Sequence, residues 1–196
     1  MTASDWPIRP LQAADVLRMA HLDFEFTSTW ALALEKEVTG LAVTWRLVPR
    51  RLEQPYRSSA FGPTEQEWAE LEQNLTNGLR EGFVVDQDGQ PVALVELGVE
   101  NWRSVGVVWN LLVHRPCRRQ GIGTALLHAA IDWGRKRSLR ALMLEAQTNN
   151  WTALRFYRRM GFVPGGVDDH FYTNWDREAG EVALFWYYEL EAGDER

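Results

Sequence analysis

The chain has 196 residues, of which 45% are hydrophobic and 24% charged, and 27 acidic against 21 basic side chains give it a net charge of −6. These fractions are typical of a folded globular protein, and the acidic balance argues against a general nucleic-acid-binding surface. No apolar run comes near the ~18 residues of a membrane-spanning helix, and because residues 1–10 include Asp5 and have no apolar core segment, we expect no signal peptide. Because the single cysteine, Cys117, excludes an intrachain disulfide and fits a reducing compartment, we expect a cytoplasmic protein with no membrane or nucleic-acid partner.

The basic residues are concentrated in one segment. Residues 115–159 contain ten arginines or lysines but only two acidic side chains, Asp132 and Glu145, so the rest of the chain is strongly acidic. A basic segment in an acidic protein indicates a local site for a polyanion, although solvated helix faces would give the same bias. The four histidines do not have the spacing of metal ligands, and we expect no metal.

The first third of the chain predicts one helix and one hairpin. A short helix is expected over residues 15–22, and alternating residues predict strands over 30–38 and 41–48 around a turn at Thr39–Gly40. Residues 49–62, which contain prolines and serines, are expected to form a loop.

The next elements are a capped helix and a second hairpin. Thr64 and Glu67 have the spacing of a capping box. The helix that follows has apolar residues at helical intervals, namely Trp68, Leu71, Leu75 and Leu79. Asp88–Gly89 is a hairpin signal between residues 82–86 and 91–100.

The remaining residues alternate strands and helices. We predict strands over 105–113, 140–147, 162–173 and 181–190, and helices over 121–137 and 150–160. Because strands come first and strand–helix units follow, the sequence predicts a mixed α/β (α+β) sheet with helices packed on it. No change in composition marks a boundary, so we expect a single domain over residues 1–196.

The most informative local motif is Arg118-Arg119-Gln120-Gly121-Ile122-Gly123-Thr124-Ala125, which follows a strand and opens a helix. Glycine has no Cβ, so a phosphate oxygen can approach the main chain, and the N–H groups at a helix start favour an anion. The third glycine of a dinucleotide-binding fingerprint and the Lys-Ser/Thr of a P-loop are both missing. A purely structural turn would give the same pattern.

Two spaced motifs resemble those of the GNAT N-acyltransferase superfamily. The first is Arg118-x-x-Gly121-x-Gly123 after a strand, and the second is Asn150-x-x-Ala153-x-x-x-Tyr157-x-x-x-Gly161-Phe162. Further segments resemble streptothricin (nourseothricin-type) acetyltransferases, among them 26–29, 142–150, 165–168 and 185–187. The resemblance implies a mostly antiparallel twisted sheet with a splayed strand pair and flanking helices, with the coenzyme A-binding core at about residues 80–190.

The resemblance also implies the roles of particular residues. The cosubstrate would be acetyl-CoA, with its pantetheine arm paired to the edge of the strand at Leu112–Val113 and hydrogen-bonded to Asn150. Tyr157 would be the general acid that protonates the departing thiolate. The pyrophosphate would lie on the main chain of Arg118, Arg119, Gln120, Gly121, Ile122, Gly123 and Thr124. From the residues alone, Asn150 is also an ordinary helix N-cap and Tyr157 a half-buried core aromatic.

The general base is the weakest assignment. Related enzymes carry a carboxylate in the strand that corresponds to 107–113, where this sequence has Trp109-Asn110. Neither residue can accept a proton from an amine. We predict that Glu145 fills this role through a water, while a structural carboxylate paired with an arginine remains the alternative.

The acceptor is expected to be a small-molecule amine. Carboxylates such as Asp168 and aromatic faces at Trp102, Trp109 and Tyr172 would suit a cation, of which a streptothricin-type antibiotic is one example. A solvated acidic loop over an aromatic core would look the same. Two other functions remain open, a protein or peptide N-acetyltransferase and a coenzyme A-binding module without chemistry, and the sequence leaves monomer and homodimer undecided.

Overall fold

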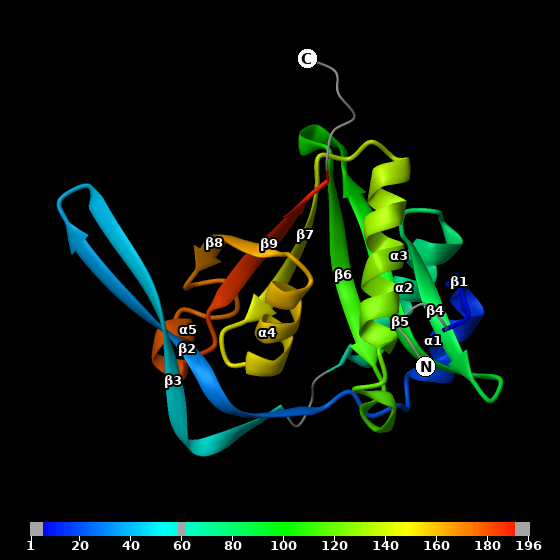
Figure 1. The fold of residues 1–196 in the computed structure, drawn as a ribbon, viewed down its shortest axis with the longest axis horizontal. Coiled ribbons are helices and arrows are strands. Elements are labelled where there is room, and N and C mark those ends of the chain that lie inside the picture. The colour runs from blue at the N-terminus through cyan, green and yellow to red at the C-terminus, as the bar shows by residue number, and fades with distance from the viewer. Residues whose placement is uncertain (1–5, 59–61, 191–196) are drawn as a thin grey trace. The chain divides into compact units, whose positions relative to one another are not determined.

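The computed structural model describes residues 6–58 and 62–190, which divide between two compact units. The sheet unit comprises the described residues of Met1–Glu25, Ala60–Leu144 and Glu189–Arg196, and the hairpin unit comprises those of Phe26–Ser59 and Glu145–Tyr188. Figure 1 shows the elements of both units with their labels.

The sheet unit contains five neighbouring strands. Antiparallel pairs join β1 (Ile8–Pro10) to β4 (Glu81–Gln87), β4 to β5 (Gln90–Glu100), and β5 to β6 (Val105–Val113). Strand β7 (Ala141–Gln147) is parallel to β6, in a ladder from Val105–Ala141 to Val108–Leu144.

Helices cover both faces of this sheet. A row of paired residues, Val84, Leu94 and Leu112, packs in one cluster with side chains from α1 (Ala13–Met19) and α2 (Glu65–Thr76). Side chains alternate between faces along a strand. On the other face, a Cβ at Gly106 would lie 2.7 Å from the ring of Trp133 in α3 (Ile122–Lys136), which Figure 1 shows running along β6. Strand β6 is therefore held by buried packing on both of its faces.

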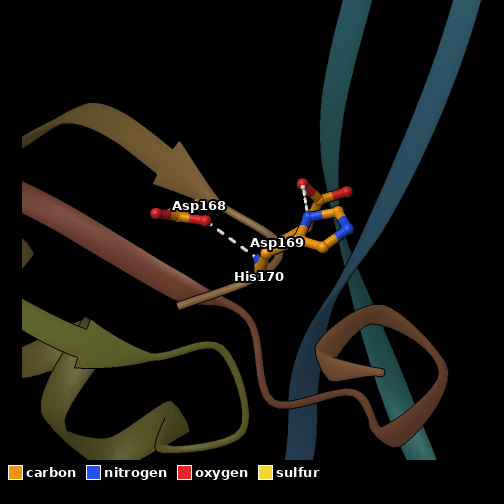
Figure 2. A group of neighbouring side chains, drawn as sticks. All are labelled: Asp168, Asp169 and His170. Atoms are coloured by element: carbon orange, nitrogen blue, oxygen red, sulfur yellow. Dashed lines mark hydrogen bonds and ion pairs between the residues drawn. The ribbon is translucent and has the colours of Figure 1, made fainter. Parts of the chain in front are cut away.

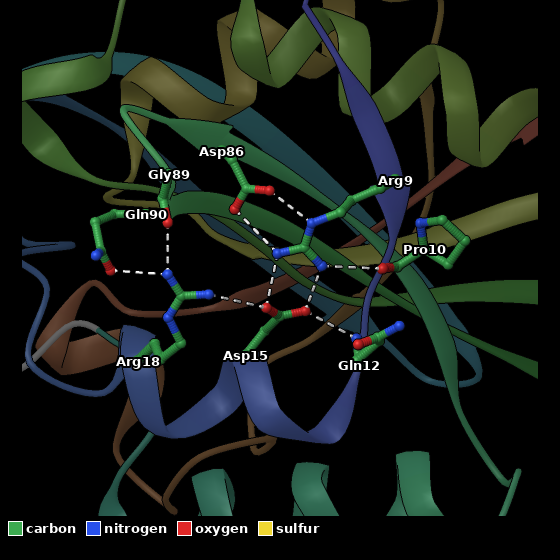
Figure 3. Close-up of polar contacts among 8 residues, drawn as sticks. All are labelled: Arg9, Pro10, Gln12, Asp15, Arg18, Asp86, Gly89 and Gln90. Carbon is green, nitrogen blue, oxygen red and sulfur yellow. Dashed lines mark hydrogen bonds and ion pairs between the residues drawn. The ribbon is translucent and has the colours of Figure 1, made fainter.

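A polar network ties the first strand to α1 and to the β4–β5 hairpin (Figure 3). The Arg9 guanidinium donates to both carboxylate oxygens of Asp15, at 2.7 Å each, and to Asp86 at 2.6 and 3.0 Å. Burial is the largest single effect and would raise the pKa of Asp15, but the hydrogen bonds from Arg9 and from the Gln12 N–H, together with the charges of Arg9 and Arg18, hold the pKa below its ordinary value. Arg18 extends the network to the turn at Gly89.

The hairpin unit contains a long two-stranded ribbon and a smaller αβ part. The ribbon pairs β2 (Phe26–Thr39) with β3 (Ala42–Ser58). The smaller part contains α4 (Trp151–Arg159), β8 (Val163–Asp168), α5 (Asp176–Ala179) and β9 (Ala183–Glu189), with β8 antiparallel to β9. The main chain of Leu32 donates to the Thr148 carbonyl at 2.9 Å, and Trp30 stacks on Trp151, so the ribbon is attached to the smaller part.

The predicted fold class is confirmed, since the sheet is mostly antiparallel with one parallel pair and flanking helices. The loop predicted over 49–62 is wrong up to Ser58, because β3 continues to that residue opposite β2; residues 59–61 lie outside the described chain. Proline lacks an N–H, but each strand of a two-stranded ribbon has one edge without a partner strand, and on that edge no N–H is needed for pairing. The strand predicted over 162–173 ends at Asp168.

The other predicted elements are confirmed within a few residues, and β1 and α5 are additional. Over the described ranges, no helix has both the length and the apolar character needed to cross a membrane.

Candidate active site

A β-bulge lies in the middle of β6. Val108 pairs with Leu97 and Asn110 with Glu96, so Trp109 is the extra residue between them. Its indole is half-exposed, with the Arg80 guanidinium 4.3 Å from the ring centroid. The bulge thereby turns Trp109 out of the strand's ladder.

Opposite the bulge, on β5, lies a buried carboxylate. Glu96 accepts from Asn110 Nδ2 at 2.6 Å and is paired with Arg80 Nε at 3.3 Å. Burial raises the pKa of Glu96 although both partners act against it. Because both carboxylate oxygens are engaged, Glu96 is a structural support of the bulge.

The main chain at the end of β6 faces two ways. The His114 N–H donates to the Val92 carbonyl at 2.9 Å, and hydrogen-bonded pairs alternate along an antiparallel ladder. Leu112 therefore directs its main chain to β5, whereas Leu111 and Val113 direct theirs to the opposite edge. The parallel ladder with β7 stops at Val108, which agrees with the expected splaying of this strand end.

The turn before α3 presents a row of main-chain donors. Arg119 and Gly121 have φ values of +65° and +87°, and the first hydrogen bond of the helix runs from the Ala125 N–H to the Gly121 carbonyl. Within the described chain, the N–H groups from 119 to 124 have no acceptor. Successive free N–H groups at a helix start form an anion-binding concavity.

The arginines of this turn have different tasks. Arg118 donates to three main-chain carbonyls, Val113 at 2.9 Å, Glu25 at 2.7 Å and Phe24 at 2.6 Å. Its guanidinium is therefore committed to the protein, and only its main chain remains for a phosphate. The Arg119 side chain has no ion pair or hydrogen bond with a described residue, so it is available to an anion.

A tryptophan that the sequence did not single out supports the same turn. Trp6 is buried, and its indole N–H donates to the Gln120 carbonyl at 2.9 Å. This bond fixes the peptide between Gln120 and Gly121, whose N–H belongs to the free row. Nothing in the sequence near Trp6 points to it, because 114 residues separate the two partners.

In the hairpin unit, Asn150 is the N-cap of α4 and its Oδ1 accepts from the Ala153 N–H at 3.3 Å. Tyr157 follows two turns later and is half-buried, with Phe156 and Phe162 against its ring. Burial, followed by the nearby Glu145 carboxylate, raises the pKa of Tyr157 above its ordinary value. The phenol therefore stays protonated at neutral pH.

Glu145 lies in β7 and is half-buried. Its Oε1 accepts a short hydrogen bond from the hydroxyl of Tyr172. Burial raises the pKa of Glu145 to about 7, with the Tyr172 hydrogen bond acting in the opposite direction. No described arginine pairs with this carboxylate, which counts against the structural alternative.

The other predicted acceptor residues have contacts of their own. Asp168 accepts from the His170 N–H at 2.9 Å, and Figure 2 shows it beside Asp169 and His170. Asp169 is itself bound to Lys36 at 3.0 Å and to His170 Nδ1 at 3.0 Å. Trp102 lies in the turn before β6, mostly exposed, at the opposite end of that strand from Val113.

A family model described as the acetyltransferase (GNAT) family matches residues 43–162. The chain belongs to the GNAT acetyltransferase family. It is 40% identical over 90 residues to streptothricin acetyltransferase A of Bacillus subtilis (strain 168), a match that covers 46% of this chain and 51% of that protein. The chain thus spans about half the length of this curated relative.

Two solved structures of similar fold cover nearly the whole chain. Nourseothricin acetyltransferase is 25% identical with a TM-score of 0.75, over 94% of this chain and 98% of that one. A Bacillus anthracis str. Ames structure in complex with acetyl coenzyme A is 22% identical with a TM-score of 0.74, over 97% of this chain and all of that one. GNAT acetyltransferases use acetyl-CoA, and the free N–H row is of the kind that holds its pyrophosphate.

Proposed function

We propose that this chain transfers the acetyl group of acetyl-CoA to a primary amine of a small cationic acceptor of the streptothricin type. The observation that carries the proposal is the row of six N–H groups from Arg119 to Thr124, which have no acceptor in the described part of the chain. The Arg119 side chain beside it likewise has no partner among the described residues. The similarity to streptothricin acetyltransferase A and to nourseothricin acetyltransferase supports the acceptor class.

Acetyl-CoA would be held by main chain more than by side chains. The N–H row would bind its pyrophosphate, and Arg119 would add a charge-assisted contact. Leu111 and Val113 would pair with the pantetheine amides in place of Leu112, whose main chain points to β5. Asn150, whose Oδ1 already caps α4, has its amide N–H2 left for the same arm.

Glu145 suits the part of general base. An amine with a pKa near ~10 is mostly protonated at neutral pH and must lose a proton before it attacks a thioester. A carboxylate whose pKa is about 7 accepts that proton more readily than an ordinary one, and about half of it is ionised at neutral pH. We infer that Glu145 takes it directly or through one water.

Tyr157 suits the part of general acid. Its raised pKa keeps the phenol protonated until a thiolate forms, and the ionised Glu145 disfavours premature loss of that proton. No described residue accepts a hydrogen bond from its hydroxyl, which leaves the proton free for a leaving group. Protonation of the thiolate would complete the transfer.

The surroundings of Tyr172 favour a cationic acceptor. Burial is the largest cause that raises the pKa of this phenol, and the carboxylates of Glu145, Asp176 and Glu181 raise it further. The electrostatic potential around the phenol is therefore negative. A negative field attracts ammonium groups of an acceptor. A streptothricin-type molecule with a β-lysine chain has that charge.

The test is thiol release from acetyl-CoA with a panel containing nourseothricin, spermidine, an aminoglycoside and a peptide with a free N-terminus. We expect turnover with the small amines, and Tyr157→Phe to lower kcat about 100-fold or more without changing KM for acetyl-CoA. Tyr188→Phe, in which a tyrosine packed on Phe162 loses only its hydroxyl, is the matched control. Tight acetyl-CoA binding without turnover would favour a non-catalytic module, and preference for the peptide would favour a protein acetyltransferase.

A further inference from the structure

The loop between β8 and α5 brings a second tyrosine onto the proposed base. The Tyr172 hydroxyl donates to Glu145 Oε1 although 27 residues separate the two. We propose that Asp176 and Tyr172 act together as a positioning device that orients the Glu145 carboxylate and stabilises its charged form. The inference rests on the proposed function, in which Glu145 is the base, and it gives Tyr172 a role besides the predicted contact with the acceptor.

Asp176 fixes the backbone of this loop. Its Oδ2 accepts from the Tyr172 N–H at 2.8 Å, and its Oδ1 accepts from the Thr173 N–H at 2.6 Å and from the Thr173 hydroxyl at 2.7 Å. The side chain is almost fully buried, at 1% exposure. Three donors on one buried carboxylate leave residues 172 and 173 little freedom to rotate.

Aromatic contacts fix the ring of Tyr172. Phe171 lies edge-on to it, with ring centroids 5.1 Å apart and an interplanar angle of 88°. Phe171 in turn meets Phe185 of β9 edge-on, at 5.5 Å. The Tyr172 phenol is therefore oriented both by its hydrogen-bonded backbone and by the Phe171 ring, and this orientation directs its hydroxyl to Glu145.

The charges around Glu145 make the Tyr172 hydroxyl important. Two phenols face the carboxylate, Tyr172 from the loop and Tyr157 from α4, while Asp176 and Glu181 face Tyr172. Among the described residues, no lysine, arginine or histidine forms an ion pair with Glu145. The neutral Tyr172 hydroxyl thus offsets part of the cost of burying the Glu145 charge. A paired arginine would stabilise the carboxylate so strongly that its affinity for a proton would be lost, whereas a hydroxyl leaves that affinity in place.

The pH dependence of acetyl transfer tests this device. Tyr172→Phe removes only the hydroxyl, and we expect the acidic limb of the pH–rate profile to move up by about one pKa unit. The rate at pH 7 would then fall about fivefold, because the ionised fraction of Glu145 drops from about one half to about one tenth. Most of the rate would return at high pH because the base is still present. Asp176→Asn should move the limb in the same direction, and Tyr188→Phe should leave it in place.

The outcomes separate this inference from the proposed function. If the acidic limb of the pH–rate profile of Tyr172→Phe keeps the wild-type midpoint, the inference is overturned. If the limb moves in Tyr172→Phe but not in Asp176→Asn, Asp176 has no part in the device. The infrared band of the protonated Glu145 carboxyl, assigned with Glu145→Gln, gives the same midpoint without turnover. If no amine is acetylated, the proposed function fails, and the band's midpoint in Tyr172→Phe still decides for or against the positioning role.

Discussion

Replacing Glu145 by glutamine should make the protein more stable at alkaline pH while removing its proposed base. The carboxylate is half-buried, and burial raises its pKa from the ordinary 4.5 to about 7. The native state therefore keeps a proton between these two values that the unfolded state has lost. By linkage, the stability of the wild type falls as pH rises through this window and stays at its lower value above pH 7.

The size of the effect follows from the same two values. A pKa raised by about 2.5 corresponds to roughly 3 kcal/mol of lost stability above pH 7, at about 1.4 kcal/mol for each pKa unit. Glutamine has nearly the same shape, still accepts from the Tyr172 hydroxyl and never ionises. For a chain of this length, 3 kcal/mol corresponds to a rise in Tm of about 6–12 °C.

Thermal unfolding of both proteins between pH 4 and pH 9 measures the difference. We expect Glu145→Gln to match the wild type below about pH 4.5 and to exceed it increasingly up to pH 7, with a constant difference beyond. Glu189→Gln, at an exposed residue of β9, is the control and should follow the wild type throughout. A Tm difference that does not change with pH would show that Glu145 ionises normally in the folded protein and would refute the reasoning.

Two further substitutions test the rest of the site. Arg118→Met should lower the free energy of unfolding by about 3 kcal/mol in chemical denaturation, since three main-chain carbonyls lose a charged donor. Arg119→Met should change the free energy of unfolding by no more than about 0.5 kcal/mol and should weaken coenzyme A binding in calorimetry. Equal losses of stability in the two variants would contradict this division of tasks. Asn150→Ala should cost about 1 kcal/mol through loss of the α4 cap, and an additional rise in KM for acetyl-CoA would separate its binding role from capping.

Local signals in the sequence were sufficient for most elements and for the glycine turn before α3. The capping box at Thr64, the Asp88–Gly89 turn and the Asn150 cap are made by residues close in the chain, and each forms as predicted. The loop over 49–62 could not be predicted in the same way, because whether a proline-containing segment becomes a strand depends on a partner such as β2.

The amino-acid sequence by itself determined the family, the glycine turn and the two motifs that frame it, because these depend on residue type and short spacing. Only the tertiary structure decided that Arg118 holds carbonyls from Phe24 and Glu25 and leaves Arg119 for an anion. It also decided that Tyr172, not an arginine, meets Glu145. Burial and hydrogen bonding between distant segments set the charge state of a side chain, and neither quantity is encoded in the residues next to it.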